Sequence, residues 1–161
     1  MEVRRATDAD WEAIWPFFRE IVRAGETYAY DPEITEPDAR EMWMVGPPGV
    51  TFAAVTDGDV VGSANAYANR PGPGDHVASA SFMVDPARAG RGAGRALGDA
   101  VLDWARSEGF AAMQFNAVVE TNERAVGLWR SLGFETIGTV PEAFRLPDGS
   151  LTGLHVMHRR L

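Results

Sequence analysis

The sequence predicts a mixed α/β fold whose elements follow in the order β-α-α-β-β-β-α-β-α-β-β. Short apolar or alternating segments, typical of strands, are interspersed with segments in which apolar residues recur every three or four positions, typical of helices. Three predicted strands follow one another without a helix between them, so we expect a mixed layer rather than a doubly wound parallel sheet. With 161 residues, the chain is expected to form one domain spanning residues 1–161.

The N-terminal part is predicted to contain one strand and two helices. The strand covers residues 3–7, and the pair Thr7 and Asp10 resembles a capping box that opens a helix. Pro16 lies inside this helix, where a kink is expected. A second helix, residues 35–43, opens with a similar signal. The apolar face of the first helix comprises Trp11, Ile14, Trp15, Phe18, Ile21 and Val22.

Three strands are predicted in the middle of the chain. Residues 50–55 and 59–68 flank Asp57-Gly58, a pair that is typical of a hairpin turn. A turn at 70–75 then leads into the strand 76–84. This strand runs directly into a glycine-rich segment.

The C-terminal part alternates helices and strands. A helix follows the glycine-rich segment and ends at Gly109, and residues 111–119 form a strand. Asn122 is a predicted N-cap of a helix that ends at Gly133. Two strands, within 134–140 and 150–161, complete the order. The first of these helices carries Leu97, Ala100, Val101, Trp104 and Ala105 on one face.

Composition excludes several classes of protein. The formal net charge is -8 and the pI is near 4.8, which argues against nucleic acid or an anionic membrane as the main partner. No apolar stretch has the length of a membrane span, and the first ten residues lack the apolar core of a signal peptide. There is no cysteine, and all 15 basic residues are arginine, so a P-loop lysine and a Schiff-base lysine are absent. We therefore expect a cytoplasmic protein.

Residues 85–98, DPARAGRGAGRALG, point to an anion site. A strand, a glycine-rich turn and a helix start together present free backbone N–H groups, and glycine allows close approach of a phosphate. The spacing G-x-G-x-G differs from that of dinucleotide-binding and P-loop motifs. The alternative is that the glycines only permit a tight turn and that the arginines are solvated. The residues concerned are Gly90, Gly92 and Gly94, with Arg88, Arg91 and Arg95.

Two motifs resemble those of the GNAT N-acetyltransferases. VDPARAGRGAGRAL (84–97) resembles their acyl-CoA pyrophosphate motif, and TNERAVGLWRSLGF (121–134) resembles the next motif in order. AMQFNAVVETN (112–122) is similar to phosphinothricin-type and yeast proline-analogue acetyltransferases. The resemblance implies a mostly antiparallel central sheet flanked by helices, and acetyl transfer from acetyl-CoA to an amine without a metal. It also implies cofactor contacts from Phe82, Met83, Val84, Arg88, Ala89, Gly90, Arg91, Gly92, Ala93, Gly94, Arg95, Asn122 and Trp129.

The chain departs from the family at three positions. Ala89 stands where an arginine or glutamine usually opens the loop motif. We expect this replacement to be tolerated, because the phosphate contacts there come mainly from the backbone. Ser79 aligns with the glutamate that serves as base in phosphinothricin-type relatives, so activation is expected through water or a nearby Asp75, His76 or Glu26. Trp129 replaces the tyrosine that many relatives use as general acid, and we expect it to be a core or pocket-wall residue. Since a thiolate leaves readily, this loss should slow the reaction rather than abolish it.

The acceptor site is expected near polar residues of the strand 111–119 and of the loop after the first helix. Asn116 shares a strand face with Gln114, opposite the apolar Met113, Phe115 and Ala117, so its amide either binds substrate or makes a hydrogen bond across the sheet. Asn122 can cap its helix and contact the cofactor at once. The candidate catalytic residues are Ser79 and Asn116, and the candidate substrate-binding residues are Glu26, Tyr28, Tyr30 and Asn116.

Three functions remain open at the level of sequence. The first is acetylation of a small-molecule amine, such as an amino acid, an amino-acid analogue or a xenobiotic. The second is acetylation of protein N-termini or lysines, and the third is an acyl-CoA-sensing module without turnover. The resemblance also implies a homodimer, to which the sequence adds only the apolar residues Leu151, Leu154, Val156 and Met157. The histidines 155 and 158 are a poor metal pair because they face opposite sides of a strand.

Overall fold

A computed structural model describes all residues from Met1 to Leu161 and confirms the predicted order of elements. Short 3-10 turns at Asp8–Asp10, Gly72–Gly74 and Pro86–Arg88 join some of them. No helix combines the length and the apolar character that crossing a membrane requires. The elements are β1 (Glu2–Arg5), α1 (Trp11–Ala24), α2 (Glu36–Trp43), β2 (Val50–Thr56), β3 (Asp59–Ala68), β4 (Val77–Val84), α3 (Ala93–Ser107), β5 (Ala112–Val119), α4 (Glu123–Ser131), β6 (Glu135–Arg145) and β7 (Leu151–Arg160).

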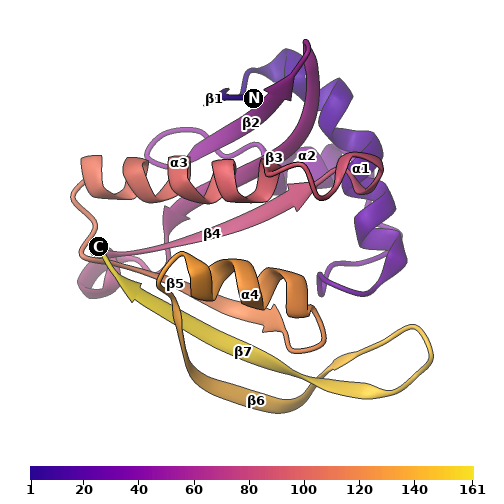
Figure 1. The fold of residues 1–161 in the computed structure, drawn as a ribbon, viewed down its shortest axis with the longest axis vertical. Coiled ribbons are helices and arrows are strands. Elements are labelled where there is room, and N and C mark those ends of the chain that lie inside the picture. The colour runs from indigo at the N-terminus through magenta and orange to yellow at the C-terminus, as the bar shows by residue number, and fades with distance from the viewer.

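One seven-stranded sheet with the strand order β1-β2-β3-β4-β5-β7-β6 organises the molecule. Every neighbouring pair is antiparallel except β4 and β5, which are parallel. The mostly antiparallel mixed fold expected from the sequence is therefore confirmed. The last strand, β7, lies between β5 and β6, and the β6–β7 hairpin extends beyond the rest of the sheet (Figure 1).

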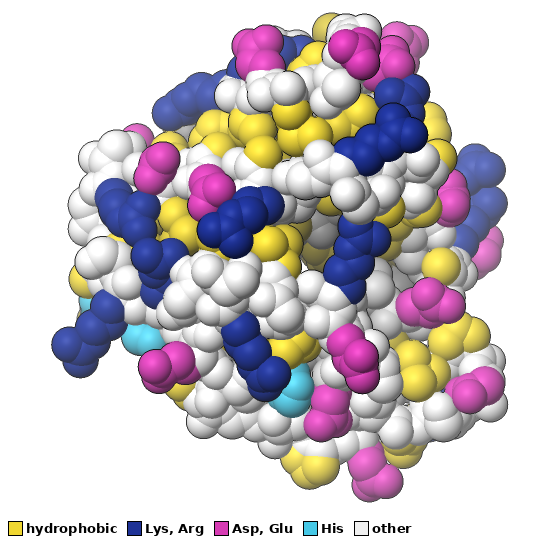
Figure 2. Space-filling model, in the orientation of Figure 1, with side chains coloured by type: hydrophobic (Ala, Val, Ile, Leu, Met, Phe, Trp, Pro, Cys, Tyr) yellow, Lys and Arg dark blue, Asp and Glu magenta, His cyan; other side chains and the backbone are white.

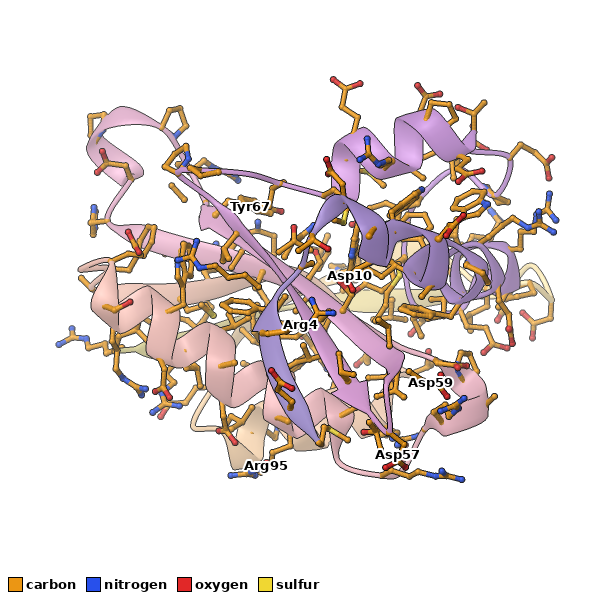
Figure 3. The ribbon with its side chains drawn as sticks, turned by 90° about the horizontal axis from the view of Figure 1, so that it is seen from above. Arg4, Asp10, Asp57, Asp59, Tyr67 and Arg95 are labelled. Carbon is orange, nitrogen blue, oxygen red and sulfur yellow. The ribbon has the colours of Figure 1, made fainter.

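Helices cover both faces of the sheet, with α3 and α4 on one face and α1 and α2 on the other (Figures 1 and 3). Leu97 and Val101 of α3 are completely buried in the larger hydrophobic cluster. Ile14 and Phe18 of α1 are completely buried in the smaller cluster, together with Trp43 of α2. The periodic apolar positions of each helix thus face the sheet, as an amphipathic pattern requires.

The parallel strands β4 and β5 pair over only two positions. Val77 lies beside Ala112 and Ala78 beside Met113, and the strands then separate. The rest of β4, as far as Val84, has no strand partner on this side. A helix-containing crossover joins β4 to β5, and their divergence opens the middle of the sheet.

A β-bulge interrupts β5 at the start of this opening. Its register against β7 shifts between Phe115 and Val118, a type of irregularity that is common beside active sites. Asn116 and Ala117 are both exposed there. The expectation that Ala117 shares one strand face with Met113 and Phe115 is therefore wrong, because the extra residue of the bulge breaks the strict alternation of side chains.

An ion pair fixes the start of α1. The Arg4 guanidinium donates to both carboxylate oxygens of Asp10, at 2.8 and 2.7 Å, and Figure 3 shows the two side chains pointing toward each other. The Thr7 backbone N–H also donates to this carboxylate at 2.6 Å, which confirms the predicted capping box. The Arg4 hydrogen bonds lower the pKa of Asp10 from its ordinary value of 3.8 to about 2.

The apolar residues of β7 do not all reach the surface. Met157 is completely buried in the core, whereas Leu154 and Val156 are half-buried and Leu151 is 44% exposed. On the neighbouring edge strand β6, Ile137 and Val140 are more than half exposed. The exposed apolar surface of the hairpin thus comes from β6 as much as from β7.

Candidate active site

A cavity of about 600 Å³ occupies the opening between β4 and β5. Its 30 lining residues come from both faces of the sheet. Arg95 of α3 and Tyr67 of β3 both line it, and Figure 3 shows them on opposite sides of the sheet. The space-filling view shows arginine and apolar side chains around a hollow beside α3 and α4 (Figure 2). The cavity therefore connects a site at the start of α3 with a site on the α1–α2 face.

The glycine loop supplies unpaired backbone donors at one end of the cavity. Gly90 and Gly92 adopt left-handed conformations, with φ of 87° and 90°, which only glycine adopts readily. Gly92 is the N-cap of α3 and provides no side-chain cap. The backbone N–H groups of Gly90, Arg91 and Gly92 have no partner within the protein, and the first turn of a helix leaves further N–H groups free. This arrangement suits a phosphate.

The loop arginines have different environments. Arg88 does not line the cavity, because its guanidinium pairs with Asp59 at 2.8 Å. Arg91 is exposed and also lies outside the lining. Arg95 lines the cavity and donates to the Ser131 hydroxyl at 3.0 Å. The other predicted loop residues in the lining are Ala89, Gly90, Gly92, Ala93 and Gly94.

Arg124 is a functional candidate that the sequence patterns did not single out. It follows the N-cap of α4 and lines the cavity. A Cβ placed on Gly90 would lie 3.8 Å from its Nη2 atom, so the guanidinium stands directly across from the glycine loop. Its place in the second motif, two residues after the predicted N-cap Asn122, was a usable signal, because a cation at a helix start can add charge-assisted hydrogen bonds to an anion site.

Gly94 has a packing role as well as a place in the lining. A Cβ at this position would lie 3.3 Å from Cδ2 of Leu128 and 3.7 Å from Cγ2 of Val84. A larger residue would therefore push α3 away from α4 and β4. At Gly92, by contrast, a Cβ would have no neighbouring atom within 4 Å, so the space beside this lining residue is open.

Aromatic side chains form the wall of the cavity on the α3–α4 face. The Trp129 ring lies 4.5 Å from the Phe82 ring and 4.8 Å from the Phe115 ring, between centroids. Trp129 is buried, which agrees with its expected place in the core or pocket wall. Met83, which follows Phe82 in β4, is buried in the hydrophobic cluster under α1 and α2. The three strand residues Phe82, Met83 and Val84 all line the cavity, and they present side chains to alternate faces.

Tyr28 occupies the unpaired edge of β4. Its hydroxyl accepts a hydrogen bond from the Phe82 N–H at 2.9 Å and donates one to the Phe82 carbonyl at 2.6 Å. The phenol thus takes the place that a neighbouring strand would fill. Burial raises the pKa of Tyr28 well above its usual range. The Phe82 N–H, which the family resemblance implies as a thioester contact, is therefore already bonded, whereas alternation directs the Val84 N–H toward the same gap.

Neutral polar side chains line the cavity on the α1–α2 face. Tyr30 stacks on Tyr28 with 5.0 Å between ring centroids, and burial raises the pKa of Tyr30. Ser79 is 4% exposed, and its hydroxyl makes no hydrogen bond within the protein. Ser81 and Tyr67, which the sequence patterns did not indicate, complete this side. The pairing of Tyr67 with Ser79 across β3 and β4 places the two side chains on one face, which strand alternation could have indicated.

The predicted asparagines both line the cavity and both bond to the protein. Asn116 donates to Asn69 at 2.6 Å and accepts from Gln114 at 2.9 Å, so three amides bridge from β5 to the end of β3. This is the hydrogen bond across the sheet that the sequence left as one alternative. The Asn122 side chain accepts from the Ala125 N–H at 3.2 Å and caps α4.

The three ionisable groups considered as bases lie elsewhere. Glu26, Asp75 and His76 are exposed, and none of them lines the cavity. Of Ser79, Glu26, Asp75 and His76, only Ser79 lines the cavity, which the amide of Asn116 also lines. A hydroxyl and an amide can orient an amine by hydrogen bonds but cannot remove its proton unaided.

Comparison with known proteins agrees with this geometry. A family model described as "Acetyltransferase (GNAT) family" matches residues 11–134. A GCN5-related N-acetyltransferase from Kribbella flavida is 66% identical, with a TM-score of 0.96 over 99% of this chain and 97% of that chain. A putative acetyltransferase from Salmonella typhimurium, solved with its cofactor acetyl-CoA, is 25% identical, with a TM-score of 0.85 over 100% and 94% of the two chains. The N-acetyltransferase aca1 of Schizosaccharomyces pombe is 27% identical over 81% of this chain and 69% of its own length.

The phosphinothricin acetyltransferase of Sinorhizobium meliloti, solved with AcCoA, shares the fold. It is 24% identical, with a TM-score of 0.90 over 99% of this chain and 88% of that chain. The family match covers well over half of the 161 residues and includes both the glycine loop and the start of α4. Together with a cavity that joins these elements across a divided sheet, it shows that this chain belongs to the GNAT family of acetyltransferases.

Proposed function

We propose that this enzyme transfers an acetyl group from acetyl-CoA to the amine of a small molecule by direct attack in a ternary complex. The observation that carries the proposal is the continuous cavity between β4 and β5, which gives each reactant its own side of the sheet. Holding two reactants side by side removes much of the entropic barrier of a bimolecular step. An amino acid, an amino-acid analogue and a xenobiotic amine are the candidate acceptors.

The residues at the start of α3 fit the diphosphate of acetyl-CoA. Free N–H groups from Gly90 to the first turn of α3 converge there, and Arg95 and Arg124 add positive charge. The apolar wall of Phe82 and Trp129 suits the pantetheine part of CoA, a narrow and partly apolar chain that would lead into the opening of the sheet. The cofactor-bound relative from Salmonella supports this assignment.

The reaction needs a neutral amine, a polarised carbonyl and a leaving thiolate. The amine nitrogen forms the new C–N bond, the C–S bond breaks, and the sulfur leaves as the thiolate of CoA. Backbone N–H groups on the gap side of β4 are suited to the developing negative charge on the carbonyl oxygen. No carboxylate or imidazole lines the cavity, so the amine loses its proton to water before or after attack.

Release of CoA thiol from acetyl-CoA tests this function. The full chain should release thiol only when an acceptor amine is added, and the product should be the N-acetylated amine by mass. A peptide bearing a free N-terminus and lysine serves as the control for protein acetylation. If acetyl-CoA binds tightly but no amine causes release of its thiol, the chain is instead a sensing module.

We also propose that the chain forms a homodimer through the β6–β7 hairpin. The support is the exposure of Ile137, Val140 and Leu151 on adjacent strands at the edge of the sheet. If no partner covered it, a long exposed apolar edge strand would be prone to pair with other chains and aggregate. Light scattering at micromolar concentration should give twice the 17.5 kDa chain mass, and Val140→Glu should give the monomer mass.

A further inference from the structure

We infer that the acceptor is a monoamine with an apolar or aromatic body and no carboxylate or other second charge. The inference rests on the proposed function and narrows it, because it separates such amines from α-amino acids. The charge distribution along the cavity, the surroundings of its tyrosines and the unpaired hydroxyl of Ser79 carry it.

Charge is confined to one end of the cavity. Among its 30 lining residues, only Arg95 and Arg124 carry charged side chains. Both stand at helix N-termini beside the glycine loop, where the diphosphate binds under the proposed function. Neither a cation nor an anion lines the cavity on the α1–α2 face. A charged group that leaves water there would have no partner, and burying an unpaired charge is costly.

The surroundings of the tyrosines on the α1–α2 face also indicate that this part of the cavity lacks charged side chains. Tyr28, Tyr30 and Tyr67 lie close enough to influence one another, and no Asp, Glu, His or Arg contributes to the raised pKa of Tyr28 or Tyr30. Burial is the largest cause in both cases. The phenols therefore lie in a region that lacks a cation to pair with a substrate carboxylate and an anion to pair with a substrate ammonium.

The walls of this region suit an apolar body. Tyr28 and Tyr30 stack as a pair, Phe18 stacks on Tyr30 with 6.2 Å between centroids, and Ile21 of α1 also lines the cavity. Aromatic rings stack favourably on such faces. An amine attached to an aromatic or aliphatic group would bury the group against these residues while its nitrogen points toward the gap in the sheet.

Neutral hydrogen-bonding groups are matched to an unprotonated amine. Ser79 is 4% exposed and lines the cavity, and its hydroxyl, which makes no hydrogen bond within the protein, can accept an N–H of the substrate. The Asn116 amide, which lines the same cavity, has its oxygen and its nitrogen bonded to neighbouring amides. A hydroxyl orients a neutral amine well, but it compensates the charge of an ammonium or a carboxylate poorly.

Three amines that differ only at one position test the inference. 2-Phenylethylamine, phenylalaninamide and phenylalanine share the aromatic ring and the amine, and they carry respectively no carboxyl group, a neutral amide and a carboxylate. The values of kcat/KM for the full chain are compared per unprotonated amine, which removes differences in basicity. We expect the first two to agree within about fivefold and phenylalanine to be at least about thirtyfold lower, because its carboxylate would be buried unpaired.

Other rankings overturn the inference in distinguishable ways. Phenylalanine equal to or better than 2-phenylethylamine would show that a cation reaches the acceptor, from this chain or from a partner copy. Phenylalaninamide as poor as phenylalanine would show that bulk, not charge, is excluded. If neither these three amines nor any other amine tested causes release of CoA thiol, the proposed function fails, and the inference that rests on it fails as well.

A second test places a cation where the structure has none. Tyr67 is 37% exposed at the rim of the acceptor side, so a long side chain can be accommodated there. Tyr67→Arg should raise the ratio of kcat/KM for phenylalanine to that for 2-phenylethylamine at least about tenfold, and the uncharged control Tyr67→Gln should not. Unchanged acetyl-CoA affinity shows that both variants are folded. An unchanged ratio in folded Tyr67→Arg would contradict the inference.

Discussion

The two ends of the cavity are built by different means. At the start of α3 the binding groups are backbone N–H groups, presented by glycines in left-handed conformations and supported by Arg95 and Arg124. On the α1–α2 face the lining consists of side chains, chiefly tyrosines and serines, on a loop and on two strands. Under the proposed function, the backbone groups would bind a feature that every acyl-CoA shares, whereas the side chains would determine which amine fits.

The difference also separates charge from neutrality. The cofactor end is cationic and open, and the acceptor end holds no ionised side chain. Under the proposed function, the reaction would therefore use the amine's own protonation equilibrium. The largest effect that we expect from this contrast is accordingly a dependence of the rate on pH.

The value of kcat/KM for 2-phenylethylamine should rise about tenfold per pH unit between about pH 6 and 8, which is about a hundredfold in all. The neutral fraction of an alkylamine grows at this rate until the pH reaches its pKa near 10. Burial raises the pKa of Tyr28 and Tyr30, so both phenols stay protonated over this range and do not produce the rise.

A weakly basic amine, unprotonated throughout the range, is the control for this profile. It should give a flat line in the same buffers. A plateau near neutral pH with 2-phenylethylamine would reveal a group in the protein that removes the proton. It would contradict the view that one end of the cavity is charged and the other is not.

Gly92→Val should raise the Kd for acetyl-CoA at least tenfold, about 1.4 kcal/mol, because a side chain would block the approach to the loop. The substitution also strains a backbone with φ of 90°. Gly109→Val is the matched control, since Gly109 has φ of 83°, open space where a Cβ would lie, and a place at the far end of α3.

Calorimetry with both glycine variants separates strain from lost binding. Both should lose stability, but only Gly92→Val should lose affinity. Equal affinity in the two folded proteins would mean that the loop glycines serve the turn alone, which was the alternative interpretation of the motif.

Tyr28→Phe should lower the free energy of unfolding by about 1–2 kcal/mol, because the Phe82 N–H and carbonyl both lose their partner. Tyr30→Phe also removes one phenol hydroxyl from the same loop, but it leaves the β4 backbone bonds intact, so its loss should be under about 0.5 kcal/mol. Urea unfolding of the two variants measures the difference. Equal losses would contradict the view that Tyr28 substitutes for a strand at the edge of β4.

Arg124→Ala should raise the Kd for acetyl-CoA about fivefold, with a weaker effect at high salt, because an exposed cation is lost from the cofactor end. Arg88→Ala should change it less than about twofold, since Arg88 is paired with Asp59 outside the cavity. The reverse order would show that the loop rearranges when acetyl-CoA binds and that Arg88 leaves Asp59.

Local sequence signals predicted most of the fold. The capping box at Thr7, the N-caps at Thr35 and Asn122, and the turn at Asp57-Gly58 depend on contacts within three or four residues, and the structure contains all of them. The left-handed conformation of the glycine loop and its place beside the cavity also agree with the sequence, because they depend on consecutive backbone conformations. Failures came where a distant segment decides the environment, as for the bulge that exposes Ala117.

The sequence by itself thus determined the elements, the family and the conformation of the glycine loop, because these follow from short-range patterns of side-chain period, capping and backbone freedom. Only the tertiary structure decided which arginines face the cavity and which residues form the acceptor end. Arg88 and Arg124 are equally charged in the sequence, but one meets Asp59 and the other faces the glycine loop. Likewise Tyr28, Tyr67 and Ser79 are brought together by strand register and by the separation of β4 from β5, which involve residues up to about fifty positions apart.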